Sequence, residues 1–343
     1  MHQLQLISGR VLYRNNKSLY LARGNKIFKR VHGRHEWKAV GSLTSPGIIG
    51  FTKNLSILSR LLRVDIHHLF PYNNNLLIIA DKSTYISCEN EISLLEPIKG
   101  SRPLVMCESK GSFYYGEYRS NPERSNVHVW QWLPGSLRWS KVWTFNSIRH
   151  IHGIFNDPYS GSIWVTTGDE DSEAGIWCTN DEFDSLQRIA GGTQQFRAIQ
   201  LIFTKDYIYF GSDTPNEKNH IYRYVRKTKQ IEQLADVNGS VFYGCKAGGS
   251  LFLSTAVEPS EVNKHRNAEV WRSDNGSDWY PFLAFKKDYF SMKYFQYGQV
   301  FFPAGPEDED FLYCSPFATR RHGKTLIIDV EISKNQFLGD GLN

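Results

Sequence analysis

The pattern of hydrophobic and polar positions is clearest between residues 149 and 190, where short apolar runs alternate with polar turns. Two runs, at 150–155 and 162–167, are separated by an Asn-Asp-Pro turn, and further runs follow at 175–178 and 187–190. Short runs rich in β-branched and aromatic residues, bounded by Gly, Pro, Asn and Asp, are typical of β-strands. This segment is therefore expected to form four short strands.

The same unit recurs along the chain with a period of roughly 40 to 50 residues. Its third run is found at 26–30, 83–87, 127–130, 175–178, 220–223, 269–272 and 310–314. Its second run is found at 18–22, 76–80, 112–116, 163–167, 207–211, 251–255 and 300–304. Arrays of such units close radially, because closure leaves only short, protected sheet edges. The predicted fold is an all-β, seven-bladed β-propeller of four-stranded antiparallel blades, with a six-bladed body as the alternative.

Three segments fall outside the regular units, and the whole chain, 1–343, is predicted to be a single domain. Residues 46–66 are interpreted as an insertion packed on the propeller. Within them, 54–63 predicts a short amphipathic helix whose leucines share one face, namely Leu55, Leu58, Leu61 and Leu62. The opening strand, 3–7, is expected to complete the last blade and so close the ring. The tail, 333–343, is expected to be frayed.

Composition excludes several classes of protein. The net charge is +5 over 343 residues, with basic and acidic residues interleaved, so neither nucleic acid nor an anionic membrane surface is an expected partner. The chain lacks the apolar runs of a signal peptide or a membrane span, and a cytoplasmic location is expected. Five cysteines without a CxxC pair argue against a disulfide framework or a zinc–cysteine site. The oligomeric state stays open.

The turn at 272–279 resembles the Asp-box, or BNR repeat, of sialidases and related propellers, which has the form S/T-x-D-x-G-x-x-W. Asp274, Gly276 and Trp279 match this motif, and Arg272 occupies the Ser/Thr position. We expect the Asp to accept backbone N–H bonds, the Gly to take a positive φ, and the Trp to pack between sheets. The resemblance implies a sialidase-like propeller in which this turn lies opposite the active site. The Arg-Ile-Pro sequence of sialidases is not found near the start.

A second resemblance covers most of the chain. The strings HIHGIFNDP, TTGD and FGSDTP are similar to those of uncharacterised Asp-box propellers that occur near polysaccharide genes in bacteria and archaea. This resemblance implies a role connected with polysaccharide, and it carries no established activity.

Propeller geometry predicts where a site would form. The first strand of each blade lines the central channel, and its entry shares one face with the loop between the second and third strands. The first-strand entries are polar, with His67, His68, Arg149, His150, His152, Arg197, Gln200, Tyr243, Lys246, Gln296 and Tyr297. The second strands lead into carboxylates, at Asp81, Glu117, Asp169, Asp213, Glu258 and Glu307. These sets predict one polar funnel in which acids and cations perturb each other's pKa values.

The funnel predicts a carbohydrate-active, glycoside-hydrolase-like protein that acts on or binds an acidic glycan or another sugar-containing molecule. Arginines hold carboxylates bidentately, and hydrolysis needs two carboxylates about 5 to 10 Å apart. Glu117 and Asp169 are the first candidate catalytic pair, with Asp213 and Glu258 as substitutes. The candidate substrate-binding residues are Arg149, His150, Arg197, Gln200, Tyr118 and Gln296.

Two other functions stay open. One is a non-catalytic binding or scaffold propeller in polysaccharide biosynthesis, which needs no acid–base pair. The other is a metal-dependent polysaccharide lyase, because imidazoles at i and i+2 of a strand lie on one face. In that case His150, His152 and His68 would bind a divalent metal ion together with an acid. The acidic loop 169–173 and the basic run 320–322 are interpreted as solvated turns.

Overall fold

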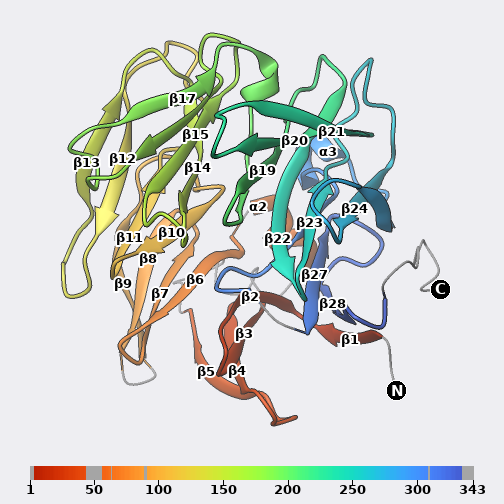
Figure 1. Ribbon diagram of the computed structural model, residues 1–343. Coiled ribbons are helices and arrows are strands. Elements are labelled where there is room, and N and C mark those ends of the chain that lie inside the picture. Colours follow the sequence, from red (N-terminus) through yellow and green to blue (C-terminus); the bar gives the residue numbers. More distant parts are fainter. Residues whose placement is uncertain (1–3, 44–55, 63, 89–90, 308–309, 334–343) are drawn as a thin grey trace.

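The computed structural model describes residues 4–43, 56–62, 64–88, 91–307 and 310–333. These residues form seven four-stranded antiparallel sheets that follow one another around a ring (Figure 1). The predicted seven-bladed β-propeller is therefore confirmed. Among the described residues, no helix is long and apolar enough to span a bilayer.

Six blades use four strands that are consecutive in sequence, with the first strand innermost. Blades 1 to 3 are β2 (Arg10–Arg14), β3 (Ser18–Arg23), β4 (Lys26–Val31) and β5 (Lys38–Ser42); β6 (Ile66–Tyr72), β7 (Asn75–Ala80), β8 (Ser83–Cys88) and β9 (Glu91–Pro97); and β10 (Met106–Ser109), β11 (Ser112–Gly116), β12 (Val127–Trp132) and β13 (Ser140–Phe145). Blades 4 to 6 are β14 (His150–Asn156), β15 (Ile163–Gly168), β16 (Gly175–Thr179) and β17 (Gln187–Gly191); β18 (Leu201–Phe203), β19 (Tyr207–Gly211), β20 (Asn219–Val225) and β21 (Ile231–Val237); and β22 (Val241–Ala247), β23 (Ser250–Thr255), β24 (Asn267–Ser273) and β25 (Tyr280–Lys286).

Blade 7 is closed by the N-terminal segment. Its order from the inside is β26 (Gln299–Phe301), β27 (Phe311–Phe317), β28 (Lys324–Asp329) and β1 (Leu4–Ser8). Leu4 pairs with Ile328, and in Figure 1 the dark red β1 lies beside the blue β28. The predicted ring-closing strand is confirmed. In the seventh unit, however, the predicted second and third strands are the first and second strands of the blade. The predicted second strand, 300–304, overlaps the inner strand β26 instead, because the outer strand comes from the other end of the chain.

The hydrophobic core lies between the blades. Seven clusters of buried side chains each join two neighbouring sheets. Leu21 of blade 1, for example, packs in one cluster with Tyr313 of blade 7. Both faces of each sheet are therefore largely apolar, and the polar residues concentrate at the strand ends. We call the face on which the inner strands begin the upper face.

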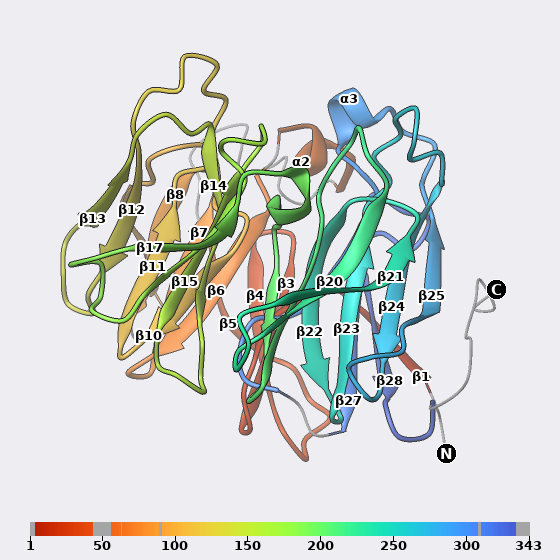
Figure 2. The ribbon, with the colours of Figure 1, turned by 45° about the horizontal axis from the view of Figure 1, so that its top comes forward.

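The insertion after blade 1 carries the helix α2 (Ser56–Leu62), which lies beside α3 (Met292–Phe295) (Figure 2). The predicted packing of the leucines on the propeller is wrong for Leu61 and Leu62, whose side chains are 42% and 48% exposed. The buried side chain is Arg60, whose Nη1 lies 2.7 Å from Asp288 Oδ2. A polar anchor thus attaches this helix. Leu55, the side chain of Leu58 and the tail from 334 lie outside the described residues.

The Asp-box-like turn joins β24 to β25 on the face opposite the upper face. Gly276 has a φ of +74°, and the Trp279 ring lies 6.2 Å from that of Tyr209 in the preceding blade, as expected. Asp274 does not play the role expected for the Asp of the motif. Asn275 Oδ1 accepts the backbone N–H groups of Ser277 and Asp278 in its place (2.8 and 2.9 Å). Asp274 instead accepts a bond from Arg272 Nε at 2.7 Å. The arginine at the Ser/Thr position thus changes the role of the aspartate.

Arg272→Ala is expected to destabilise the protein by about 3 to 5 kcal/mol, because the fully buried guanidinium leaves polar partners unpaired. Those partners are Asp274 of its own turn, and Val330 O and Ser333 Oγ at the end of blade 7, both at 3.1 Å. Urea unfolding measures the loss. The control Lys110→Ala removes an ion pair whose lysine is 58% exposed and should cost about 1 kcal/mol or less. Equal effects would contradict a structural role for Arg272.

Candidate functional site

Three side chains of blade 4 converge on the upper face. His150 and His152 come from the start of the inner strand β14, and Asp169 follows the end of β15. The strand pairing shifts between Ile151 and Gly153, so His152 has no partner residue on β15. Such a bulge re-aims the side chain of the extra residue. Glycine is also required beside it, since a Cβ on Gly168 would lie 2.9 Å from the His152 ring.

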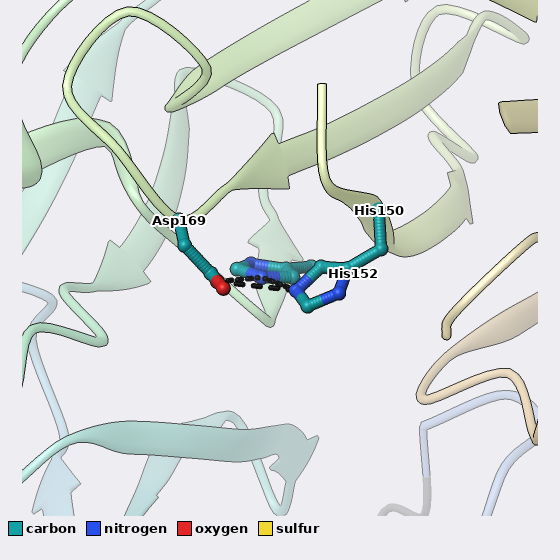
Figure 3. A group of neighbouring side chains, drawn as sticks. All are labelled: His150, His152 and Asp169. Carbon is teal, nitrogen blue, oxygen red and sulfur yellow. Dashed lines mark hydrogen bonds and ion pairs between the residues drawn. The ribbon is translucent and has the colours of Figure 1, made fainter. Parts of the chain in front are cut away.

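The three side chains point their polar atoms at one another (Figure 3). Nε2 of His150 lies 3.1 Å from Asp169 Oδ1, and Nε2 of His152 lies 3.4 Å from the same oxygen. The two Nε2 atoms are 3.2 Å apart. His150 and His152 are 6% and 2% exposed, so this cluster is nearly shielded from solvent.

The other nitrogen of each imidazole is already committed. Nδ1 of His150 donates to the carbonyl of Arg119 (3.2 Å), and Nδ1 of His152 donates to the carbonyl of Ala198 (3.1 Å). A carbonyl only accepts, so the proton of each neutral ring is on Nδ1. Both Nε2 lone pairs then face each other and a carboxylate oxygen. Such an arrangement is repulsive unless a cation or a further proton lies between these atoms.

Burial lowers the pKa of His152 to about 4, so this ring is neutral at pH 7. Burial acts to raise the pKa of Asp169, but its contacts with His150 and His152 hold that pKa well below its usual range. At neutral pH the cluster therefore contains a neutral imidazole whose Nε2 lone pair faces an ionised carboxylate.

The spacing of the three atoms fits a divalent metal. For metal–ligand distances of about 2.1 Å, two ligands lie about 3.0 Å apart at an octahedral angle and about 3.4 Å apart at a tetrahedral angle. The observed separations of 3.1, 3.2 and 3.4 Å fall within this range. Backbone carbonyls that fix the imidazoles are the usual outer partners of histidine ligands. Three protein ligands also leave positions open for a substrate.

Two arginines surround this cluster. Arg149 Nη1 lies 3.0 Å from Asp169 Oδ2, and Arg197 Nη2 lies 3.2 Å from Asp169 Oδ1. Glu173 is 5% exposed and accepts the backbone N–H groups of Arg149 and Asp169, at 3.1 and 3.2 Å. It also accepts Arg124 Nε at 2.5 Å. The interpretation of loop 169–173 as solvated charge is therefore wrong at Glu173, which positions the neighbouring residues.

Arg197 also links this cluster to Asp213, the carboxyl group that follows the second strand of blade 5. Arg197 Nε lies 3.4 Å from Asp213 Oδ2. Burial raises the pKa of Asp213 to about 8; Arg197 opposes this rise, and Glu258 and Asp169 add to it. Two carboxyl groups on one guanidinium are thus driven to opposite protonation states at neutral pH, the pattern that separates an acid from a base.

Tyr118 covers one side of this cluster. Its ring centroid lies 4.3 Å from that of His150, and burial raises the pKa of its hydroxyl, as do Asp213 and Asp169. Arg102 and Tyr243, which line the central channel, also act electrostatically on this hydroxyl.

Several predicted site residues are engaged by partners outside the cluster. Glu117, the first predicted partner of Asp169, accepts Trp130 Nε1 at 2.9 Å within its own blade. Gln296 is buried and donates to the carbonyl of Arg60 in α2 at 3.4 Å. His68 was predicted as a metal ligand, but its Nε2 donates to the carbonyl of Pro103 at 2.9 Å. These side chains are held by other partners, and Asp169 supplies the acid that was expected beside His150 and His152.

The remaining predicted acids divide between the two faces. Glu258 accepts Ser240 Oγ at 3.2 Å and acts on Asp213 from the neighbouring blade. Glu307 lies between β26 and β27 and pairs with Lys246 at 2.7 Å, at the lower end of the channel. Its misplacement follows from the one-strand error in blade 7. Asp81 occupies the β7–β8 turn with a φ of +50°.

The channel forms a central cavity of about 620 Å³. Residues 154–156 of β14 line it, so the strand that presents His150 and His152 continues along its wall. Gln200 lines it too, and its Nε2 donates to the carbonyl of Leu201 at 2.9 Å. Arg102 lies in the wall and was not predicted, because the segment before Pro103 carries no strand pattern.

The sequence matches no protein-family model, and no curated protein sequence is significantly similar to it. The fold is similar to an oligogalacturonate lyase in complex with manganese, at a TM-score of 0.56 and 8% identity, covering 96% of this chain and 92% of that one. It is also similar to the extracellular domain of a hybrid two-component system of B. thetaiotaomicron, at a TM-score of 0.59 and 12% identity, covering 95% of this chain and 39% of that one. A chain of the mitotic checkpoint complex gives a TM-score of 0.54 at 7% identity, covering 95% and 93%. These likenesses show the propeller fold, which serves unrelated functions.

Proposed function

We propose that this propeller binds an acidic oligosaccharide through a divalent metal ion held by His150, His152 and Asp169. The observation that carries the proposal is the convergence of two Nε2 atoms and a carboxylate oxygen within 3.1 to 3.4 Å, while both Nδ1 atoms donate to backbone carbonyls. A metal ion resolves the repulsion among these lone pairs. Imidazole and carboxylate ligands suit zinc, iron and manganese.

The charge around the metal favours an anionic ligand. Arg149 and Arg197 flank the single ligand carboxylate, and a divalent ion adds to their charge. Arg149 is 37% exposed, and its Nε makes no hydrogen bond within the described part of the chain. A sugar carboxylate bound to the metal would supply an acceptor for this donor. Tyr118 provides an aromatic surface beside it for a sugar ring.

The likeness to a lyase crystallised with manganese extends to the fold alone, and it supports the choice of manganese and oligogalacturonate as the first probes. The Asp-box-like turn adds no argument for sialidase-like hydrolysis. Asp169 is engaged by two imidazoles and two guanidinium groups, and Glu117 by Trp130. Neither carboxylate is therefore suited to act as a glycosidase nucleophile.

A second candidate function is β-elimination of a uronate chain, and Asp213 is the observation that favours it. In that reaction a base removes the proton next to the sugar carboxylate, a carbon–carbon double bond forms, the bond to the leaving oxygen breaks, and an acid protonates that oxygen. A neutral Asp213 beside Arg197 is suited to the acid role. The cations would stabilise the charge that develops on the sugar carboxylate.

The protein stripped of metal with EDTA is expected to bind one Mn²⁺ per chain, and trigalacturonate only after Mn²⁺ has been added. Isothermal titration calorimetry measures both steps, with neutral maltotriose as the matched control ligand. Ultraviolet absorbance of the new double bond then separates cleavage from binding alone. Equal binding of trigalacturonate with and without metal, or equal binding of maltotriose, would overturn the proposed function.

A further inference from the structure

The upper part of the central cavity contains two arginines that form no ion pair with a carboxylate of the described residues. Among the described residues, Arg102 makes no hydrogen bond and no ion pair. Arg10 lies with its guanidinium carbon 3.7 Å from the centre of the Phe301 ring, and its Nη2 donates to the carbonyl of His67 at 3.5 Å. Its Nε is buried and has no acceptor within the described chain. These two side chains thus retain donors for a ligand.

The acids that line the same cavity are engaged at its other end. Glu307 pairs with Lys246 at 2.7 Å and accepts the Gly249 N–H at 3.2 Å. Glu108 lies near the end of β10 and accepts the Gly111 N–H at 2.8 Å. Arg10 begins β2, on the upper side. The cavity is therefore polarised, with unpaired positive charge in the half nearer His150 and His152.

Asp65 acts electrostatically on both arginines, and it lies outside the cavity lining. It lines a separate pocket of about 240 Å³ between blades 1 and 7. Burial raises the pKa of Asp65, against the effects of Ser59, Arg10 and Arg102. Burial and both arginines lower the pKa of His68 to about 4. His68 is therefore neutral at pH 7, and the positive charge of this region comes from Arg10 and Arg102.

The cavity that contains the two arginines adjoins the strand of the cluster on blade 4, because residues 154–156 of β14 line it. Arg102 acts electrostatically on Arg10 and on Tyr118, whose ring lies 4.3 Å from His150. The cavity volume of about 620 Å³ lies within the range of sites that enclose small organic ligands, roughly 300 to 1,000 Å³. An elongated ligand that begins at the cluster and follows β14 would therefore enter the cavity.

We infer that the upper half of the central cavity is an anion-binding subsite in which Arg10 and Arg102 hold a second acidic group of the ligand. The inference rests on the proposed function for the identity of that ligand, which becomes an oligosaccharide with acidic groups on at least two sugar units. The first carboxylate binds at His150, His152 and Asp169, and the second enters the channel. The arginines recognise a carboxylate, a sulfate or a phosphate by the same charge-assisted hydrogen bonds.

Arg102→Gln tests the subsite, because Arg102 has no hydrogen-bond or ion-pair partner among the described residues and its replacement should leave folding intact. In the presence of Mn²⁺, the affinity for trigalacturonate is expected to fall about 10- to 100-fold, the usual effect of losing hydrogen bonds to a charged group. Affinities for galacturonate and for Mn²⁺ itself should stay within about two-fold of wild type, since both lie outside the subsite. Arg138→Gln, on the exposed β12–β13 turn, is the matched control and should leave all three affinities unchanged.

The outcomes separate the subsite from the proposed function. If wild type and Arg102→Gln bind trigalacturonate equally, the subsite is wrong, whereas metal-dependent binding of galacturonate still stands. If neither uronate binds to the wild type with Mn²⁺, the proposed function fails, and inorganic phosphate then probes the cavity alone. Phosphate binding that Arg102→Gln removes supports the anion site; phosphate binding that is absent or unchanged overturns it.

Discussion

Alanine in place of His152 is expected to weaken Mn²⁺ binding by more than about 100-fold, because replacing even an outer-shell partner of a metal ligand costs about 10- to 100-fold. His152 supplies one of three converging ligand atoms, and its ring is 2% exposed. Neither His150 nor Asp169 reaches the vacated position. Isothermal titration calorimetry or equilibrium dialysis with Mn²⁺ and Zn²⁺ measures the loss, and metal-dependent binding of trigalacturonate should disappear with it.

His68→Ala is the matched control for this experiment. Its imidazole donates to a backbone carbonyl, as that of His152 does. It lines the cavity, however, and lies outside the cluster. Metal affinity should therefore be unchanged. The alternative to a metal is a proton on His150 Nε2 shared between His152 Nε2 and Asp169 Oδ1. In that case the wild type binds no divalent ion, and a metal-free wild type in dialysis would refute the metal site.

Asp213→Asn is expected to make the protein more stable than wild type at pH 8.5 and to give a much smaller difference at pH 4. The native pKa of Asp213 is raised to about 8, above the unfolded value of about 3.9. Between these values the folded state binds more protons than the unfolded state, so wild-type stability falls as pH rises from about 4 to about 8. Asparagine does not titrate, so the variant escapes this loss.

The size of the effect follows from the size of the shift. Each pKa unit corresponds to about 1.4 kcal/mol, so the relative stability of the two proteins should change by several kcal/mol, on the order of 5 at most. Urea unfolding at the two pH values measures it. Asp157→Asn is the control, because it removes a fully buried carboxylate that pairs with Arg226 at 2.6 Å. That variant should be destabilised at both values. Equal destabilisation of Asp213→Asn at both pH values would show that native Asp213 is ionised.

The hydrophobic pattern by itself determined the fold. Short β-branched and aromatic runs separated by turn residues specify strands locally, and their repetition specified the blades and the strand that closes them. Six blades have the predicted strand order. The error in blade 7 arose because its outer strand, β1, is more than 300 residues from its partner β28, and local pattern alone cannot show which strand of that blade is supplied from elsewhere.

The tertiary structure decided which polar residues meet. His150 and His152 stood out as a pair on one strand, but only the tertiary structure shows that Asp169 is the acid beside them and that His68 and Glu117 bond to other groups. The carbonyls of Arg119 and Ala198, which fix the two imidazoles, come from the β11–β12 loop of blade 3 and from the connection between blades 4 and 5. Backbone groups carry no residue-type signal, and burial, which shifts Asp213, exists only once the blades have packed. The sequence therefore determined the scaffold, and packing between blades determined the chemistry of the site.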